Sequence, residues 1–234
     1  MKLNRNYFIS IIIPMIDEIN SLNKTLKILN KIKCKKEYLI ILSKVKTPKK
    51  IIQTLNLMKR KKKIKFYYQK EKFVGGAIKT GISKSKGSHI AIMAADLETN
   101  PSDLSKMINI SKKNKSMIVS ADRWINNKSF TNYGFIKLIF NKLAQIFLKV
   151  LYKINILDFT FAYRIYPRRA LLENRITELK HGFALEILLK PVKRGYGVIS
   201  FPSKWKARVE GKSNANYKVY LSFLKVLLVN LIYK

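Results

Sequence analysis

Cysteine, histidine and acidic residues are scarce in this chain of 234 residues. Its one cysteine, Cys34, cannot form an intrachain disulfide, which is typical of proteins from a reducing compartment. One cysteine and two histidines provide no ligand set for a structural zinc site. The sequence also lacks a GxSxG motif around a nucleophilic serine, and it has no zinc-finger or RNP motif. These absences exclude disulfide-stabilised scaffolds, zinc-finger proteins and hydrolases built on a serine elbow.

Long hydrophobic runs are absent as well, although 47% of the residues are hydrophobic. No segment offers the roughly 20 apolar residues that a membrane-spanning helix needs. The N-terminal stretch MKLNRNYFISIIIPMIDE loosely resembles a signal peptide, but Pro14 interrupts its apolar run and acidic residues follow at once. We therefore expect no cleaved signal sequence, and we expect residues 8–13 to form a first buried strand.

Basic residues greatly outnumber acidic ones, with 48 Lys and Arg against 13 Asp and Glu and a net charge of +35. This balance favours anionic partners such as phosphorylated substrates, lipid headgroups or nucleic acid. The excess is mostly lysine, alongside much isoleucine and asparagine, which is also the pattern of a genome with biased composition. Because the lysines are dispersed, we expect no nucleic-acid partner, and nucleic-acid binding is an alternative that rests on charge alone.

A regular alternation of strands and helices occupies the first half of the chain. The expected strands are short apolar runs at 8–13, 38–42, 64–68, 89–93 and 116–121. The expected helices lie around 20–32, 48–60, 77–83 and 101–113. Such alternation predicts an α/β fold with a mainly parallel sheet covered on both faces. Neither an internal repeat nor a Gly/Ser-rich linker interrupts the chain, so we predict a single domain over residues 1–234.

The pattern changes in the second half, where residues 133–156 form one long helical candidate. Lys142, Lys149 and Lys153 share one narrow face of this helix, and the apolar residues share another: Ile136, Ile139, Leu143, Phe147, Val150 and Ile154. The ordinary interpretation is a helix packed on the domain with its lysines in water. The alternative is a helix that lies at a membrane interface. The last segment, 217–234, is apolar almost all round and is expected to be buried against the domain, a partner or a membrane surface.

The most informative stretch of the chain is GSHIAIMAADLETNPSDL, which runs from Gly87 to Leu104. Its apolar run ends at Ala94-Ala95, and two carboxylates follow, Asp96 and Glu98. Open α/β sheets bind ligands at the carboxyl ends of their strands, and residues two apart in an extended segment face the same side. Asp96 and Glu98 would therefore share one hard cation such as Mg²⁺ or Mn²⁺. The alternative is a solvated acidic turn after a strand.

Three further segments carry candidate functional groups. Residues 75–81 open a helix after a glycine turn, where backbone amides and Lys79 in the first helical turn would attract a phosphate, although most such turns are only turns. Asp158 and Arg164 are the first and last residues of the segment DFTFAYR and would form a structural ion pair with each other. Residues 205–214 form a cationic loop that either closes over phosphates or is simply exposed.

Taken in order, these segments resemble the family-two inverting glycosyltransferases with a GT-A fold. The most similar branch is the dolichyl-phosphate mannose synthase and polyprenyl-phosphate sugar transferase group, and the resemblance runs from about residue 9 to residue 222. The segment Ile11–Pro14 with Glu18 is similar to the first strand and nucleotide loop of that family, where Asp17 replaces an Asn. Ala94–Glu98 stands at the place of the Asp-x-Asp motif, and Asp96 matches its second Asp.

The resemblance continues on the side of the acceptor. Arg123 matches the Arg of a Gly-Ser-Arg motif, and Lys137 and Asn141 fall where the polyprenyl-phosphate branch often has Arg and Ser. The segment Asp158–Arg164 is similar to an Asp-Pro-Thr-Ser-Gly-Phe-Arg signature, and Arg208 opens a loop similar to Arg-x-x-Gly-x-Ser. The resemblance implies that this loop closes over donor and acceptor.

As a whole, the resemblance implies a three-layer, Rossmann-like GT-A fold. Residues 1–122 would bind the nucleotide sugar, residues 123–216 would form the acceptor side, and residues 217–234 would form an apolar C-terminal helix. The implied reaction is sugar transfer, with inversion, from a nucleotide-diphosphate sugar to a polyprenyl phosphate or a glycan or lipid-linked acceptor. Mg²⁺ or Mn²⁺ would assist, and the protein would be cytoplasmic and peripheral at the inner face of the cell membrane.

The resemblance also implies a set of site residues. The catalytic residues would be Asp96, Asp158 and Arg208, with Asp158 as the base for a hydroxyl acceptor. The metal would be held by Asp96 and Glu98. The donor would contact Pro14, Glu18, Gly76, Lys79, Ala95 and Asp96, and the acceptor would contact Arg123, Lys137, Asn141 and Arg164.

Two departures from the family pattern remove carboxylates from the expected donor pocket. Ala94 replaces the first Asp of the metal motif, and Ser43-Lys44 stands where the family usually has an Asp pair that contacts the base and ribose. Either the donor is held differently, or the chain is a degenerate, non-catalytic module that binds a nucleotide sugar or another partner.

Overall fold

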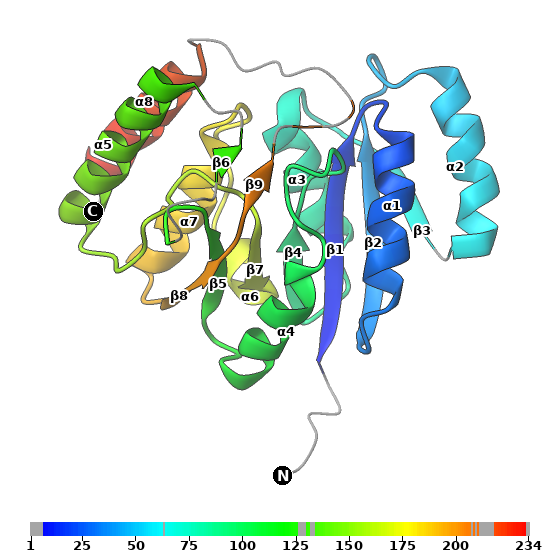
Figure 1. Ribbon diagram of the computed structural model, residues 1–234, viewed down its shortest axis with the longest axis horizontal. Helices are drawn as coiled ribbons and strands as arrows, with labels where there is room; N and C mark the ends of the chain where they lie inside the picture. The colour runs from blue at the N-terminus through cyan, green and yellow to red at the C-terminus, as the bar shows by residue number, and fades with distance from the viewer. Residues whose placement is uncertain are drawn as a thin grey trace.

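A seven-stranded mixed sheet forms the centre of the protein (Figure 1). The computed structural model describes residues 7–62, 64–125, 130–131, 134–206, 208, 210 and 218–232. The strands, in sheet order, are β3 (Ile64–Tyr68), β2 (Lys35–Leu42), β1 (Phe8–Met15), β4 (His89–Ile92), β7 (Arg164–Pro167), β5 (Ile118–Asp122) and β8 (Val198–Pro202). Every neighbouring pair is parallel except β7, which runs antiparallel to both β4 and β5. The predicted α/β class with a mainly parallel sheet is confirmed.

Helices cover both faces of this sheet and divide the core into two clusters. On one face pack α1 (Ile19–Asn30), α2 (Lys49–Lys62) and α4 (Asp103–Lys113). On the other face pack α3 (Phe73–Lys84), α6 (Arg168–Leu172) and α7 (Phe183–Lys193). The first strand shows why its sequence is an apolar run. Ile11 and Ile13 enter the first cluster while Ile12 enters the second, so both faces of β1 are buried.

Several elements lie outside the predicted alternation. The strand β7 follows α5 (Phe135–Tyr152), and a small parallel pair joins β6 (Phe130–Thr131) to β9 (Trp205–Lys206). The helix α3 begins at Phe73, four residues earlier than expected, so Gly75 and Gly76 lie inside its first turn. Lys79 consequently lies in the second turn of α3 rather than in the first, which corrects the sequence prediction.

The long helix α5 exposes the apolar face that its periodicity defines. The exposed fractions of Ile139, Leu143, Phe147 and Val150 range from 43% to 73%. The helix is attached through Leu148, which joins the second core cluster, as does Val226 of the C-terminal helix α8 (Lys218–Ile232). Four of the six predicted apolar positions are therefore uncovered by the described part of the chain, whereas Ile154 is buried in the second core cluster. Within the described residues, no helix has the length and hydropathy of a membrane span.

Candidate functional site

Asp96 and Glu98 lie in the loop that follows β4, which ends at Ile92. The segment between them is a turn, not the extended stretch that we expected, because Leu97 has a left-handed conformation with φ of 64°. The Glu98 amide donates to Asp96 Oδ1 at 3.1 Å and closes the turn. A left-handed conformation costs a non-glycine residue roughly 1–2 kcal/mol, and strain of this kind clusters at functional sites.

Arg208 joins the two carboxylates from a distant part of the chain. Its Nη2 lies 2.8 Å from Glu98 Oε1 and 3.4 Å from Asp96 Oδ2. Its Nε also donates to Glu98 Oε1, at 2.9 Å. The carboxylates of Asp96 and Glu98 therefore both face one cation, which in this structure is the Arg208 guanidinium.

Burial gives the Asp96 carboxyl an unusual affinity for protons. The side chain belongs to a residue that is 6% exposed, and burial, followed by the charge of Glu98, raises its pKa to about 6. The nearby carboxylate of Glu18 contributes to this rise, whereas the hydrogen bond from the Glu98 amide and the charge of Arg208 oppose it. A cation bound between these carboxylates would favour the ionised form of Asp96.

Glu210, two residues after Arg208, contacts the start of α1. Its carboxylate accepts hydrogen bonds from the Ser21 amide at 2.8 Å and from the Asn20 amide at 3.4 Å. No side chain of the preceding loop caps α1, and Glu18 instead accepts from the Ile16 amide at 2.7 Å. An anionic group is favoured at a helix N-terminus, so Glu210 supplies the missing acceptor there.

A buried ion pair lies where β5 ends. Arg123 Nε donates to Asp158 Oδ2 at 2.6 Å and Arg123 Nη2 donates to Asp158 Oδ1 at 2.9 Å. Asp158 is fully buried and also accepts from the Phe161 amide at 3.1 Å, while the Arg123 guanidinium lies 4.5 Å from the centre of the Phe161 ring. Asp158 therefore pairs with Arg123, and the predicted pair with Arg164 is wrong.

Comparison with known proteins assigns this arrangement to a family. The model of the family described as glycosyl transferase family 2 matches residues 10–174, which include Glu18, Asp96, Arg123 and Asp158. The chain belongs to glycosyl transferase family 2. It is a glycosyltransferase by family, and the matched range spans the central strands from β1 to β7.

Solved structures of one enzyme share the fold of this family member. Glucosyl-3-phosphoglycerate synthase from Mycobacterium tuberculosis, in complex with Mn²⁺, UDP and glucosyl-3-phosphoglycerate, has a TM-score of 0.73 and 11% identity, and the match covers 96% of this chain and 80% of that chain. Its complex with Mn²⁺, UDP and phosphoglyceric acid has a TM-score of 0.74 and 11% identity, and the match covers 96% of this chain and 78% of that chain. Its complex with Mn²⁺, UDP-glucose and phosphoglyceric acid has a TM-score of 0.71 and 10% identity, and the match covers 96% of this chain and 79% of that chain. At these identities the likeness concerns the fold, and the expected GT-A type is confirmed.

Four of the predicted donor residues of this glycosyltransferase lie in β1, in α3 and in the loop after β4. Pro14 is in β1 and pairs in register with Ile41, and Ala95 is buried next to Asp96. Lys79 forms an ion pair with Glu71 at 2.5 Å, on a partly exposed part of α3. Gly76 lies one turn earlier in α3, where the chain packs tightly against the Glu71 backbone.

Gly76 is required by packing, independently of any phosphate. A Cβ at this position would lie 2.2 Å from the Glu71 carbonyl oxygen, a backbone atom that cannot move aside easily. We expect Gly76→Ala to lower the free energy of unfolding by about 1–3 kcal/mol, the usual range for overpacking. The matched control is Gly134→Ala, since nothing lies within 4 Å of a Cβ there. Urea denaturation of both variants measures the difference, and equal stability of the two would contradict this role.

Arg164 is fully buried, and its guanidinium is hydrogen-bonded inside the fold. It donates to Ala184 O at 2.6 Å, Phe159 O at 2.9 Å and Ser120 Oγ at 2.9 Å. These acceptors come from α7, the loop before β7, and β5. Arg164 thus ties three elements together, and this internal role replaces its predicted contact with the acceptor.

The helix α5 contributes a polar residue that sequence reasoning missed. Gln145 is buried, and its Nε2 donates to Asn141 Oδ1 at 2.7 Å and to Thr160 Oγ1 at 3.1 Å. Asn141 is partly exposed beside this contact, whereas the side chain of Lys137 lies outside the described part of the chain. The sequence signal that could have identified Gln145 is a polar residue on the narrow buried side of an otherwise apolar helix.

Two further residues escaped the sequence analysis. Asp122 ends β5 and accepts from the amides of Trp124 at 2.9 Å and Leu157 at 2.8 Å. Its signal, a carboxylate directly after an apolar strand, is the one that identified Asp96. His181 lies close enough to Arg208 and Glu98 for both charges to act on its ring.

Proposed function

We propose that this glycosyltransferase moves a sugar, with inversion, from a nucleotide-diphosphate sugar to a polyprenyl phosphate. One observation carries the proposal: the Asp96 and Glu98 carboxylates converge on a single cation at the ligand-binding edge of a family-two sheet. Structures of the same fold contain Mn²⁺ with UDP or UDP-glucose, which supports a donor of this class. The likeness to the polyprenyl-phosphate branch supports the choice of acceptor.

The residues at this edge fit a divalent metal. Asp96 and Glu98 provide two carboxylates directed at one point, and hard cations such as Mg²⁺ and Mn²⁺ prefer oxygen ligands. Among the described residues no third His, Cys, Asp or Glu completes a metal-binding group, so phosphate and water oxygens would supply the other ligands. Bound there, the metal would neutralise the charge of the leaving diphosphate. Arg208 would have to release both carboxylates for them to hold it.

The environment of Asp158 favours a phosphate acceptor over a hydroxyl acceptor. A hydroxyl needs a general base within hydrogen-bonding reach, and Asp158 was the predicted base. Both of its carboxylate oxygens are engaged by Arg123, and the residue is fully buried. A phosphate oxygen is already anionic and needs no base, so Arg123 and Asp158 act by positioning the loop before β7.

The test is a panel of nucleotide-diphosphate sugars assayed for release of nucleoside diphosphate. Each donor is offered with and without Mn²⁺, and with polyprenyl phosphate or a simple glycan as acceptor. We expect release that needs both the metal and the polyprenyl phosphate. Nucleotide-sugar binding with no release from any donor would indicate instead a non-catalytic module, the function that the loss of carboxylates at Ala94 and Ser43 suggests. Release with the glycan alone would overturn the choice of acceptor.

A lipid acceptor requires contact with a membrane, and α5 supplies a surface for it. Phe140, Leu143 and Phe147 are 57–64% exposed, and the exposed Lys142 lies among them. An apolar helix face bordered by lysines is typical of helices that lie in the interface of an anionic bilayer. We therefore propose that the enzyme docks on the inner face of the cell membrane through α5.

Docking through α5 predicts the behaviour of one pair of variants. We expect Leu143→Ser with Phe147→Ser to weaken binding to anionic vesicles at least tenfold, because each buried apolar side chain contributes about 1.5–3 kcal/mol. The control is Val45→Ser with Leu57→Ser, which removes two apolar residues that are 93% and 72% exposed elsewhere. Co-sedimentation at low and at physiological salt measures both. Equal binding by the two variants would leave α5 without this role.

A further inference from the structure

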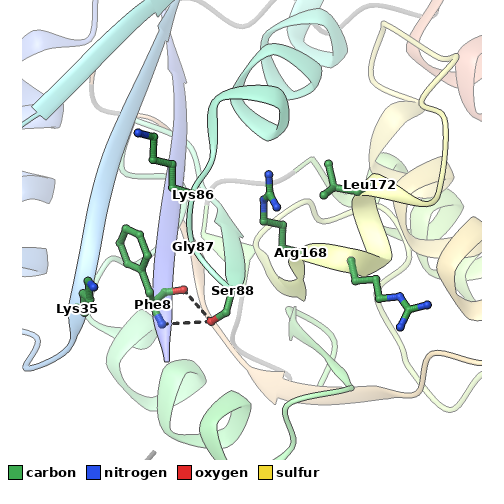
Figure 2. A pocket seen from close by; sticks show the side chains of 8 residues that line it. Phe8, Lys35, Lys86, Gly87, Ser88, Arg168 and Leu172 are labelled. Atoms are coloured by element: carbon green, nitrogen blue, oxygen red, sulfur yellow. Dashed lines mark hydrogen bonds between the residues drawn. The ribbon is translucent and has the colours of Figure 1, made fainter. Parts of the chain in front are cut away.

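A basic cavity lies at the end of the sheet opposite Asp96. It has a volume of about 590 Å³ and is formed where β1, β2 and β4 begin and where β7 leads into α6. Its lining residues are Phe8, Lys35, Lys86, Gly87, Ser88, Arg168, Arg169 and Leu172 (Figure 2). Four of them are basic and none is acidic. The volume is within the range of cavities that bind small molecules.

The floor of this cavity is fixed by buried polar groups. The Lys86 amide donates to Glu37 Oε1 at 2.8 Å, and the Gly87 amide donates to Ser10 Oγ at 2.8 Å. Ser10 in turn donates to Glu37 at 2.7 Å. A Cβ at Gly87 would lie 2.6 Å from the Ser10 amide nitrogen, so only glycine allows this close approach. The segment that leads into β4 is thus held in one position.

The basic groups around this floor have few negative partners. In the described part of the chain, no acidic side chain forms an ion pair with Lys35, Lys86 or Arg168, whereas Arg169 pairs with Glu173. Arg168 is instead oriented by a hydrogen bond from its Nε to the buried Ser85 Oγ at 3.3 Å. Figure 2 shows Lys86 and Arg168 on either side of the Gly87–Ser88 segment. Lys35, Lys86 and Arg168 gathered around one cavity outweigh the nearby Glu37 carboxylate and create a positive potential that an anion would neutralise.

The chemistry of the lining indicates which anion fits. Arginine forms paired hydrogen bonds to phosphate oxygens, and lysine adds point charges. The Ser88 hydroxyl is engaged with the Phe8 backbone, to whose carbonyl it donates at 3.1 Å, so the charged groups are the lining's contacts for an anion. Phe8 and Leu172 offer apolar contact for the group that carries the phosphate. We propose that this cavity is a second anion site, separate from the nucleotide-sugar edge, that binds the phosphate group of a small molecule or a lipid. The proposal is independent of the proposed transferase reaction.

The test compares a cavity variant with a variant of equal charge. Pyrophosphate binding is measured by calorimetry in EDTA at low salt for the full chain, for Lys86→Gln with Arg168→Gln, and for Lys113→Gln with Arg175→Gln. Lys113 and Arg175 are exposed and lie outside the cavity. We expect the cavity variant to bind at least about tenfold more weakly and the control to change less than about twofold, since charge-assisted hydrogen bonds are the strong ones. Thermal unfolding confirms that each variant is folded, and Lys86→Gln alone provides a milder change.

A second arm distinguishes the two sources of phosphate. Vesicles that contain phosphatidic acid replace pyrophosphate, and the same three proteins are compared. A specific loss by the cavity variant in the pyrophosphate arm alone assigns a soluble phosphate compound. A specific loss in the vesicle arm assigns a lipid headgroup. Equal losses by the cavity and control variants in both arms would show only the general attraction of a chain with net charge +35 and would overturn the proposal.

Discussion

Asp96→Asn is expected to lower kcat/KM for metal-dependent sugar transfer at least about 100-fold. The amide carries no charge and is a poorer ligand for a hard cation. Because Ala94 occupies the place of another acidic residue, Glu98 alone would remain to hold the metal. The measurement is the Mn²⁺-dependent release of nucleoside diphosphate from the donor that the panel identifies. Full turnover by Asp96→Asn would exclude this carboxylate from the metal site.

The same substitution is expected to preserve the fold, and even to stabilise it at high pH. Burial raises the pKa of Asp96 to about 6, so ionisation of this carboxyl opposes folding as the pH rises from about 4 to about 6. Above that window Asp96→Asn removes a penalty of about 2–3 kcal/mol, whereas near pH 4 the two proteins should be equally stable. In the parent protein, the affinity for Mn²⁺ should rise between pH 5 and pH 7, because the metal must displace the proton that Asp96 binds there.

The matched control for this substitution is Asp103→Asn. Asp103 lies on the first turn of α4 and accepts a hydrogen bond from Ser203 at 2.8 Å, which an asparagine can also accept. It makes the same change of charge seven residues away, and turnover within about twofold of the parent is expected. A comparable loss of turnover in both variants would point to general electrostatics.

Asp158→Ala is expected to lower the free energy of unfolding by about 3–5 kcal/mol, because it removes the carboxylate that balances the charge of the buried Arg123 guanidinium. The pair is bidentate, and Asp158 is fully buried. The double variant Arg123→Met with Asp158→Leu removes both charges and should recover most of the loss. Urea denaturation of the parent, Arg123→Met, Asp158→Leu and the double variant gives the coupling energy of the pair.

An exposed ion pair provides the comparison for this result. Lys79→Met breaks the contact with Glu71, where both side chains are more than one third exposed, and a change below about 1 kcal/mol is expected. If Asp158 were instead the general base, Asp158→Asn would lose turnover while its stability stayed close to that of the parent. That outcome would restore the catalytic role that the sequence suggested.

The parallel half of the fold could be predicted because its strands are buried on both faces. Runs such as Ile11–Ile13 are apolar throughout and are bounded by turns, so their sequence reveals them. The strand β7 could not be found in this way, since it begins with Arg164 and ends with Pro167. The Arg164 guanidinium can be buried because it donates to oxygens of Ser120 and Ala184, which come from distant parts of the chain.

The candidate site was predictable to a similar extent. The place of Asp96 after an apolar strand follows from sequence alone, but its pKa depends on burial that only the folded chain provides. The sequence favoured Arg164 as the partner of Asp158, whereas packing in the folded chain brings Arg123 to it instead. The periodicity of the sequence defined the apolar face of α5. Whether the domain covers that face depends on which side of the helix packs on the core, and the structure shows that this is the side of Leu148.

The position of β7 also determines the order in which the sheet can be assembled. β4 and β5 follow one another along the chain, yet β7 lies between them, and its residues follow β5 by about 45 positions. Since β7 begins 72 residues after β4 ends, a nascent chain made at roughly 5–20 residues per second presents an unpaired β4 edge for about 4–14 seconds. Unpaired edges are templates for aggregation. Substitutions that weaken β7 should therefore act mainly through the yield of folded enzyme in the cell, and much less through the turnover of the molecules that do fold.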